Sequence, residues 1–242
     1  MFFPGQKNIG TSKRRDGRIA IMSDPGYWIS DALLSRRECE ALIEVLSRPT
    51  ARRGRAGARH LMATPEIGAF ASDPRLLRIA QETLGPSAVA YRATLFEKSG
   101  RANWLVSWHQ DTVLPLKWRV GSSEWGPWST KQGVLYAQAP GWALGRILAL
   151  RVHLDASTNE NGPLRVIPGS HRAGVLGEAA VLNFARQHQP FECPAPRGGV
   201  IAMRPLLIHS SSKARAGEPR RVLHIEYAES MHLGGDIHLA LA

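Results

Sequence analysis

The spacing of apolar residues changes near Gly85, and this change limits the folds that the chain can adopt. Before Gly85 the apolar residues recur at helical intervals. The segment Ser35-Arg36-Arg37-Glu38 has the form of a capping box, in which serine and glutamate satisfy free backbone amides, and it predicts a helix start. A second helix is expected to begin at Asp73-Pro74, with proline at its first helical position, and to end near Gly85.

After Gly85 the chain consists of short strand-like segments separated by turn residues such as Asn161-Gly162-Pro163. Residues 89–96 alternate along their length as a strand does. Further strands are expected at residues 104–108, 147–154, 164–167, 199–203, 206–209 and 221–227. Helices followed by many short strands predict a mainly β fold, an antiparallel double-sheet barrel with helices packed outside it.

A chain of 242 residues is long enough for one domain with a sizeable core. We expect residues 1–86 to form an N-terminal extension with helices that pack on the barrel, and residues 87–242 to form the barrel itself. Six of the seven tryptophans lie between residues 104 and 142, among Gly and Pro. An irregular insertion at about 112–146 is expected there, either as a binding loop or as aromatic residues that pack a loop onto the barrel.

Several classes of protein are disfavoured by the composition. No segment reaches the roughly 18 apolar residues of a membrane span, and the first residues lack the basic and apolar regions of a secretory signal. Cys39 and Cys193 are far apart and make no disulfide framework, so we expect a cytoplasmic protein.

The net charge of +11 raises the question of a nucleic-acid partner. About half of the excess lies in the first 60 residues, in the runs Lys13-Arg14-Arg15-Asp16-Gly17-Arg18 and Arg52-Arg53-Gly54-Arg55 followed by Arg59. Aromatic residues do not interleave with these runs, as they do where single strands bind. A solvated basic surface is therefore the preferred interpretation, and nucleic-acid binding the less favoured one.

Chemistry is indicated most clearly at His109-Gln110-Asp111. Residues two apart on a strand share a face, so His109 and Asp111 can bind one metal ion. A His-x-Asp triplet is common by chance and needs a third ligand from a distant strand. Among nine histidines, His209 is the best placed, because it is expected to end an apolar strand after a Gly-Gly turn.

Two histidines and one carboxylate on one face of an octahedral metal ion are the ligand set of non-haem Fe(II) oxygenases. Three positions stay open, two for a 2-oxo acid and one for dioxygen. The distal carboxylate of 2-oxoglutarate then needs a planar bidentate partner, which arginine supplies. Arg220 and Arg221 begin the next strand, and alternation allows only one inside. The spacing from His209 favours Arg220.

The chain resembles the phytanoyl-CoA dioxygenase family. The resemblance rests on 108–111 (Trp-His-Gln-Asp), on 161–171 (Asn-Gly-Pro-Leu-Arg-Val-Ile-Pro-Gly-Ser-His), and on His209 followed by Arg220. It runs from about residue 87 to 228 and implies a double-stranded β-helix, a jelly-roll or cupin-like barrel. It also implies Fe(II), 2-oxoglutarate as cosubstrate, and O2.

By this resemblance His109, Asp111 and His209 match the catalytic iron ligands, and Arg220 matches the residue that binds the 2-oxoglutarate carboxylate. Ser211 matches a small polar position that can reach the same cosubstrate. The family also contains halogenases, in which a small residue replaces the carboxylate so that chloride can bind iron. Asp111 is present, so the resemblance favours a hydroxylase.

Arg151 stands where family members can carry an aromatic residue. With His153 it shares the strand face opposite Leu150, Val152 and Leu154. If that face is the barrel interior, the guanidinium needs an anionic partner, and 2-oxoglutarate or an acidic substrate group would serve. The alternative is that the strand face of Arg151 lies on the outside of the barrel.

Other polar residues near these motifs have less certain roles. His171 is expected to be structural, with its ring bonded to the loop backbone, and His224 to be a core histidine or a pocket residue. Possible pocket walls are Asn103, Tyr91 and Thr94.

The sequence therefore predicts an Fe(II)- and 2-oxoglutarate-dependent dioxygenase that hydroxylates an unactivated C–H bond of a small or medium organic substrate. The tryptophan-rich insertion suggests an apolar or ring-bearing substrate, and Arg151 an anionic group on it. Two alternatives stay open. One is a non-enzymatic metal-binding protein of cupin type, and the other is an oxygenase directed at nucleic acid by the basic N-terminal surface.

Overall fold

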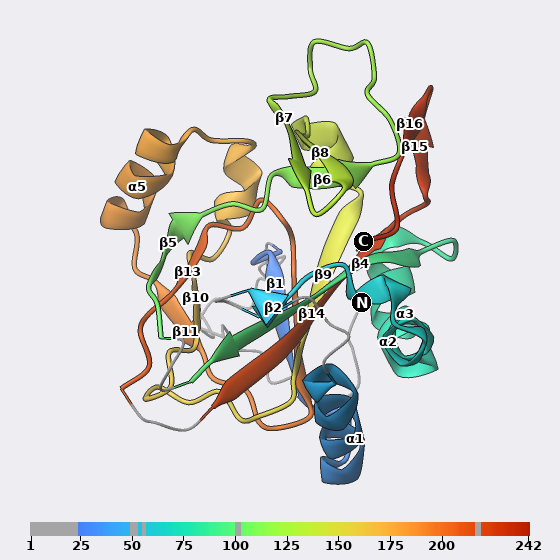
Figure 1. Ribbon diagram of the computed structural model, residues 1–242. Coiled ribbons are helices and arrows are strands. Elements are labelled where there is room, and N and C mark those ends of the chain that lie inside the picture. The colour runs from blue at the N-terminus through green and yellow to red at the C-terminus, as the bar shows by residue number, and fades with distance from the viewer. Residues whose placement is uncertain (1–23, 49–52, 55–56, 100–102, 216–218) are drawn as a thin grey trace, which may run out of the picture.

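The computed structural model describes residues 24–48, 53–54, 57–99, 103–215 and 219–242. Within them, two antiparallel sheets face each other (Figure 1). The larger sheet consists, in spatial order, of β1 (Tyr27–Ala32), β12 (Gly199–Met203), β9 (Ile147–His153), β14 (Arg220–Ala228), β4 (Val89–Lys98), β3 (Gly57–Ala58) and β2 (Arg53–Gly54). The smaller sheet consists of β11 (Phe191–Cys193), β10 (Leu164–Val166), β13 (His209–Ser211) and β5 (Val106–His109). One buried apolar cluster joins Ile201 and Met203 of the larger sheet to Leu164 and Val166 of the smaller.

Helices cover the outer face of the larger sheet (Figure 1). They are α1 (Arg36–Ser47), the 3-10 turn η1 (Leu61–Ala63), α2 (Pro65–Ala71) and α3 (Pro74–Leu84). The predicted capping box at Ser35 and Glu38 is confirmed, and so is the start of α3 at Pro74. Leu76 of α3 is fully buried against the sheet, so its truncation to alanine is expected to cost about 2–5 kcal/mol.

The alternation of β14 decides which side chains meet the second sheet. Leu223 and Ile225 belong to the apolar layer under the helices. Residues of opposite parity, among them Arg220, His224 and Glu226, are buried on the other face, between the sheets. β14 pairs with β9 on one side and β4 on the other, so charged side chains of three neighbouring strands gather there.

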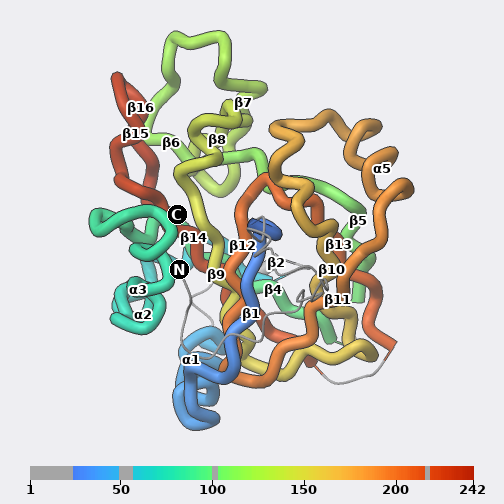
Figure 2. The backbone as a smooth tube through the Cα atoms, turned by 180° about the vertical axis from the view of Figure 1, so that it is seen from behind, coloured from blue at the N-terminus to red at the C-terminus, as the bar shows by residue number. Residues whose placement is uncertain are grey.

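The tryptophan-rich insertion contains regular structure, and the expectation of an irregular segment is wrong. It forms a separate sheet of β6 (Val113–Leu116), β8 (Val134–Gln138) and β7 (Trp128–Lys131), followed by α4 (Gly141–Leu144). Gln132 and Gly133 both have positive φ, as the tight hairpin between β7 and β8 requires. A hairpin of β15 (His232–Gly234) and β16 (Ile237–His238) lies beside this insertion in both views (Figure 2).

Other strand predictions need correction. β1 is a strand where the N-terminal third was expected to be helical, and it pairs with β12. The expected strand at 206–209 is a turn, in which Leu207 N–H donates to Arg204 O, so His209 begins β13 rather than ending a strand. Pro205 has no N–H to donate to a ladder, which explains the break.

The far side of the smaller sheet is covered by α5 (Glu178–Gln187), whose Val181 packs on Ile167 and Ile208. A 3-10 turn, η2 (Ser170–Ala173), precedes it. None of the helices in the described ranges is long and apolar enough to cross a membrane.

Candidate metal centre

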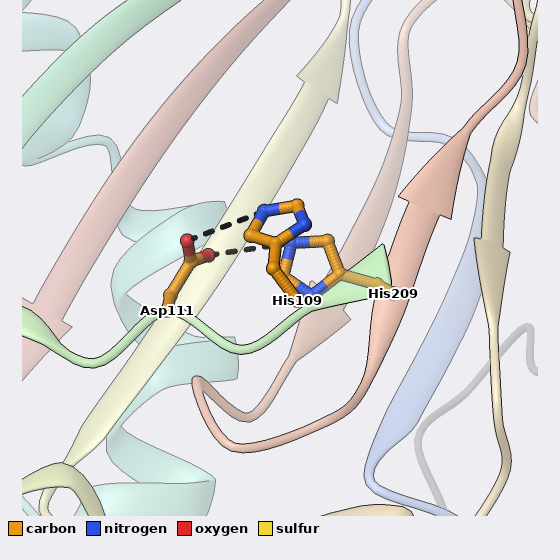
Figure 3. A group of neighbouring side chains, drawn as sticks. All are labelled: His109, Asp111 and His209. Atoms are coloured by element: carbon orange, nitrogen blue, oxygen red, sulfur yellow. Dashed lines mark ion pairs between the residues drawn. The ribbon is translucent and has the colours of Figure 1, made fainter. Parts of the chain in front are cut away.

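Three side chains, two from the adjacent strands β5 and β13 and one from the loop after β5, converge between the sheets (Figure 3). His109 ends β5, His209 begins β13, and the two residues are direct partners in the ladder. Asp111 follows two residues after His109, where its N–H donates to Pro205 O at 2.9 Å. Asp111 Oδ1 lies 3.9 Å from His109 Nε2, and Oδ2 lies 3.6 Å from His209 Nε2. The predicted third ligand thus comes from the neighbouring strand.

Backbone contacts fix the orientation of both imidazoles. His109 Nδ1 lies 2.8 Å from Ser107 O, and His209 Nδ1 lies 2.8 Å from Leu207 O. A carbonyl can only accept, so each Nδ1 carries the proton and donates it. Each Nε2 therefore presents a lone pair on the side where the Asp111 carboxylate lies, as metal-binding histidines do.

The electrostatic environment favours the protonation states that bind a metal ion. Burial opposes ionisation of Asp111, but the His209 and His109 rings beside it lower its pKa below the usual value. Burial also lowers the pKa of His209, with a further contribution from His109. A carboxylate and a neutral imidazole at pH 7 are the forms that a divalent cation requires.

The segment between the ligands is held by Gln110, whose amide points away from them. Its Nε2 donates to Gly174 O at 2.9 Å and to Leu206 O at 2.8 Å, and its Oε1 accepts from Leu176 N at 2.9 Å. These bonds join β5 to the turn before β13 and to the loop before α5. They fix the spacing of His109, Asp111 and His209 before any ligand binds.

A second polar cluster lies at the other end of β13. Ser211 is two residues after His209, about 7 Å along the strand. Its hydroxyl donates to Gly162 O at 2.8 Å and accepts from Lys98 Nζ at 2.7 Å, with Arg220 Nη2 at 3.4 Å. Arg220 and Lys98 are ladder partners on β14 and β4, so two cations and a hydroxyl meet at one point.

These cations are buried without an anion in the described part of the chain. Arg220 is 3% exposed, and its Nε and Nη1 have no hydrogen-bond partner. Burial and the nearby Arg151 lower the pKa of Arg220 to about 9. Burial, Arg220 and Arg151 lower the pKa of Lys98 to about 7. Arg220 thus has buried N–H groups without a partner and a lowered pKa, and both features fit a binding site for a carboxylate.

The choice between the two adjacent arginines is settled by the strand face. Arg221 points away from the cluster and forms a bidentate ion pair with Asp155, at 2.7 and 2.9 Å. Arg220 therefore faces the space between the sheets, as the spacing predicts.

Arg151 also lies in the interior, so the alternative of an external face is wrong. It is buried, its Nη1 is 3.3 Å from His224 Nδ1, and its guanidinium stacks on Phe96 at 5.5 Å. Its Nε has no hydrogen-bond partner. His153, on the same face, is fully buried with both ring nitrogens unpaired, and burial lowers its pKa well below the usual value.

His224 is a buried histidine within a chain of charged groups rather than an apolar core. Its Nε2 lies 3.6 Å from Glu226 Oε1, and Glu226 accepts from Arg92 Nη2 at 2.8 Å. Asp111 lies close enough to His224 and Glu226 for the three to be neighbours. This chain links Arg151 to the metal centre through side chains of β9, β14 and β4.

The other predicted residues take structural positions. His171 lies 3.8 Å from Asp24 rather than bonding the loop backbone, and Tyr91 is buried in an apolar cluster beside the insertion. Asn103 joins two loops through paired bonds with Ala214. Thr94 faces inward as the ladder partner of His224.

The basic run at 13–18, together with Arg52 and Arg55 of the second run, lies outside the described residues.

Lys98 is the residue of the cluster that the sequence did not single out. The alternation of β4 could have found it, because Lys98 shares the parity of Phe96 and Thr94, which face inward. A lysine at a strand end is usually solvated, and only its ladder partner Arg220 reveals that it is buried.

Two curated proteins show sequence similarity to the chain. The L-proline trans-4-hydroxylase of Streptomyces griseoviridis is 27% identical over 180 residues, covering 64% of this chain and 59% of that protein. The ectoine dioxygenase of Sphingopyxis alaskensis is 29% identical over 186 residues, covering 68% and 54%. The match thus spans less than two thirds of either relative's length.

Solved structures share the fold. EctD from S. alaskensis with 2-oxoglutarate and 5-hydroxyectoine superimposes with a TM-score of 0.65 at 22% identity, covering 90% of this chain and 79% of that one. The 2-oxoglutarate-dependent carbocyclase SnoK from nogalamycin biosynthesis gives 0.63 at 17% identity, covering 85% and 80%. The family model described as phytanoyl-CoA dioxygenase matches residues 22–222, more than half of the sequence. The chain therefore belongs to the phytanoyl-CoA dioxygenase family.

Proposed function

We propose that the protein is an Fe(II)- and 2-oxoglutarate-dependent dioxygenase that hydroxylates an unactivated C–H bond of a small or medium organic molecule. One observation carries the proposal. The buried, unpaired guanidinium of Arg220 lies in the same space between the sheets as three converging metal-binding side chains. A protein that only stored a metal ion would have no use for a buried anion site.

Each of these residues has a defined role in the proposal. His109 and His209 donate Nε2, and Asp111 donates a carboxylate oxygen, to one face of Fe(II). The unpaired Nε and Nη1 of Arg220 hold the distal carboxylate of 2-oxoglutarate, Lys98 adds a positive charge beside it, and the Ser211 hydroxyl positions both cations. Arg151 lies on β9, next to the strand of Arg220 in the same sheet, and binds the cosubstrate on the side of Asp111. With iron bound, 2-oxoglutarate and O2 supply the oxidation, giving succinate, CO2 and hydroxylated product.

The chain's own contribution is orientation and exclusion of water. The two Nδ1–H bonds hold the imidazoles rigid, and Gln110 fixes the loop between the ligands. The apolar cluster between the sheets, which includes Leu164 and Ile201, limits water in this space, and this strengthens the attraction between cations and carboxylate. Asp111 supplies the carboxylate that a halogenase lacks, so the proposed outcome is hydroxylation.

Three finer points belong to the same proposal. The facing sheets form a double-stranded β-helix whose core strands lie within residues 87–242, with the helices before residue 87 packed on it, β1, β2 and β3 added at the edges of the larger sheet, and 112–146 inserted in it. The protein acts on small molecules, as the names of the L-proline and ectoine relatives suggest. It works in the cytoplasm, which is supported by two buried free cysteines.

The test is an anaerobic titration of the apo protein with Fe(II) and then 2-oxoglutarate, following the weak visible charge-transfer band of the chelate. We expect the band in the wild type and its loss in His209→Ala. His171→Ala, which removes a histidine outside the centre, should keep it. Bound iron without the band in the wild type would contradict the proposal and favour a non-enzymatic metal-binding protein.

A further inference from the structure

His153 is a buried histidine to which the proposed function gives no role. It lies on β9 two residues after Arg151, on the sheet face opposite Val152, which packs under the helices. Its side chain is fully buried between the two sheets. Within the described ranges, neither Nδ1 nor Nε2 of its ring has a hydrogen-bond partner. A buried polar group without a partner destabilises a fold, so its presence calls for an explanation.

The ladder between β9 and β14 places His153 beside the proposed cosubstrate site (Figure 1). His153 pairs with Val222, and Arg220 is its diagonal neighbour, two residues earlier on β14. Diagonal neighbours on one face of an antiparallel pair are about 7–8 Å apart, a distance that long side chains can span. Lys98 is the ladder partner of Arg220 on β4. Arg220 thus has Lys98 on one neighbouring strand and His153 on the other.

Buried nitrogens without a hydrogen-bond partner belong to three side chains of this face. In the described part of the chain they are Nε and Nη1 of Arg220, Nε of Arg151, and both ring nitrogens of His153. Burial, Arg151 and Arg220 lower the pKa of His153 well below its usual value. The ring is therefore neutral at pH 7, and it carries one N–H group and one lone pair.

A neutral ring between two arginines suits an anion rather than a metal ion. Guanidinium groups repel a cation, and the described groups of side chains that could hold a metal ion do not include His153. A carboxylate has about four acceptor positions on its two oxygens, and Nε and Nη1 of Arg220 can occupy two of them. The imidazole N–H of His153 can occupy another without adding a further buried positive charge.

We propose that His153 is a cosubstrate-binding residue, whose ring N–H donates to the distal carboxylate of 2-oxoglutarate beside Arg220. The inference rests on the proposed function, and it gives His153 a part in the selection of a 2-oxo acid that carries a second carboxylate. Arg220 and Lys98 contribute charge to this selection, and His153 contributes a directed hydrogen bond. Without the cosubstrate the ring nitrogens stay unpaired, so His153 lowers the stability of the apo protein while it favours binding.

The test is the variant His153→Leu, which keeps a buried side chain of similar size and removes both ring nitrogens. The iron-loaded protein is titrated anaerobically with 2-oxoglutarate and with pyruvate, which lacks the distal carboxylate. We expect the Kd for 2-oxoglutarate to rise about 10- to 100-fold and the Kd for pyruvate to stay within about threefold. The Tm of the apo variant should equal or exceed that of the wild type, because unpaired buried groups are removed.

Three further variants serve as controls. His153→Asn places an amide nitrogen near the position of Nδ1, and His153→Gln places one near Nε2. One of the two should therefore restore most of the affinity for 2-oxoglutarate. His188→Leu is the same substitution at an exposed histidine just after α5, and it should alter the Kd of neither acid.

The possible results separate a binding role from a structural one. Wild-type affinity for 2-oxoglutarate in His153→Leu would overturn the inference. So would an equal loss of affinity for both acids together with a lower Tm, since that pattern marks a structural residue. Failure of both amide variants to restore binding would show that the shape of the ring matters and not its N–H, and would overturn it too. Absence of the charge-transfer band in the wild type would instead reject the proposed function.

Discussion

In the proposed function, cosubstrate binding depends most on Arg220, because its Nε and Nη1 are buried and unpaired. A bidentate charge-assisted contact to a carboxylate is worth about 2–4 kcal/mol, so Arg220→Met is expected to raise the Kd for 2-oxoglutarate about 30- to 1,000-fold. Anaerobic titration of the iron-loaded variant measures it. The adjacent Arg221→Met, which removes an outward-facing guanidinium, should leave the Kd within about threefold. Equal effects of the two would contradict the assignment.

Lys98 should make cosubstrate binding depend on pH, because its pKa is about 7. Below pH 7 the amine is protonated and attracts a carboxylate, and above pH 7 it is increasingly neutral. Binding then requires uptake of a proton, so affinity for 2-oxoglutarate should fall by up to about tenfold per pH unit above pH 7. Titrations from pH 6 to 8.5 test this. Lys98→Met should bind more weakly with a flatter profile, and a flat wild-type profile would refute the role.

The site could be predicted from the sequence where short-range geometry decides it. His109 and Asp111 are two residues apart near a strand end, alternation places only one of Arg220 and Arg221 inside, and the spacing from His209 selects Arg220. Lys98 and the chain from His224 to Arg92 could not be predicted, because they depend on which strands become neighbours of β14. That ladder is a long-range feature with no local signal.

Among the elements, the turn before β10 is the most sensitive, because Gly162 has φ +71° and is packed against the proposed cosubstrate site. A Cβ there would lie 2.3 Å from Ser212 O and 3.3 Å from Lys98 Nζ. Gly162→Ala should therefore displace the Ser211–Ser212 backbone, destabilise the fold by more than the ~1 kcal/mol of a left-handed residue, and weaken 2-oxoglutarate binding.

Gly133→Ala is the matched control for this turn. Gly133 has φ +87° in the β7–β8 hairpin, and a Cβ there meets nothing within 4 Å. It should lose about 1 kcal/mol of stability by denaturant unfolding and keep its affinity for 2-oxoglutarate. If both variants bound the cosubstrate as the wild type does, the Gly162 turn would have no part in the site.

The elements themselves were predictable to different degrees. Helix starts at Ser35 and Pro74 follow from local capping chemistry, and the structure confirms them. The insertion was not predictable as a sheet, because its strands are interrupted by Gly, Pro and Trp and are stabilised by each other. β13 begins at His209 because Pro205 forces a turn before it. Local sequence signals therefore predict the starts of helices well and predict short strands poorly.

At the scale of the whole molecule, the interior between the sheets carries more cationic than anionic groups. Arg92 is compensated by Glu226, whereas in the described part of the chain Arg151 has Asp111 as a carboxylate nearby and neither Lys98 nor Arg220 forms an ion pair. Their lowered pKa values mean that the unfolded state binds protons more readily than the folded state, which costs stability near neutral pH. A dicarboxylate that fills this space should relieve the cost and stabilise the whole fold.

Thermal unfolding of the iron-loaded protein under anaerobic conditions tests this expectation. At 100 times its Kd, 2-oxoglutarate should add about 2.7 kcal/mol, which corresponds to a rise in Tm of about 5–10 °C for a chain of this length. Pyruvate carries the same 2-oxo acid group and lacks the distal carboxylate, so at equal concentration it should raise Tm much less. Arg220→Met should remove most of the difference between the two acids, because it removes the group that distinguishes them. A wild-type protein stabilised equally by both would show that the buried cations do not hold the distal carboxylate.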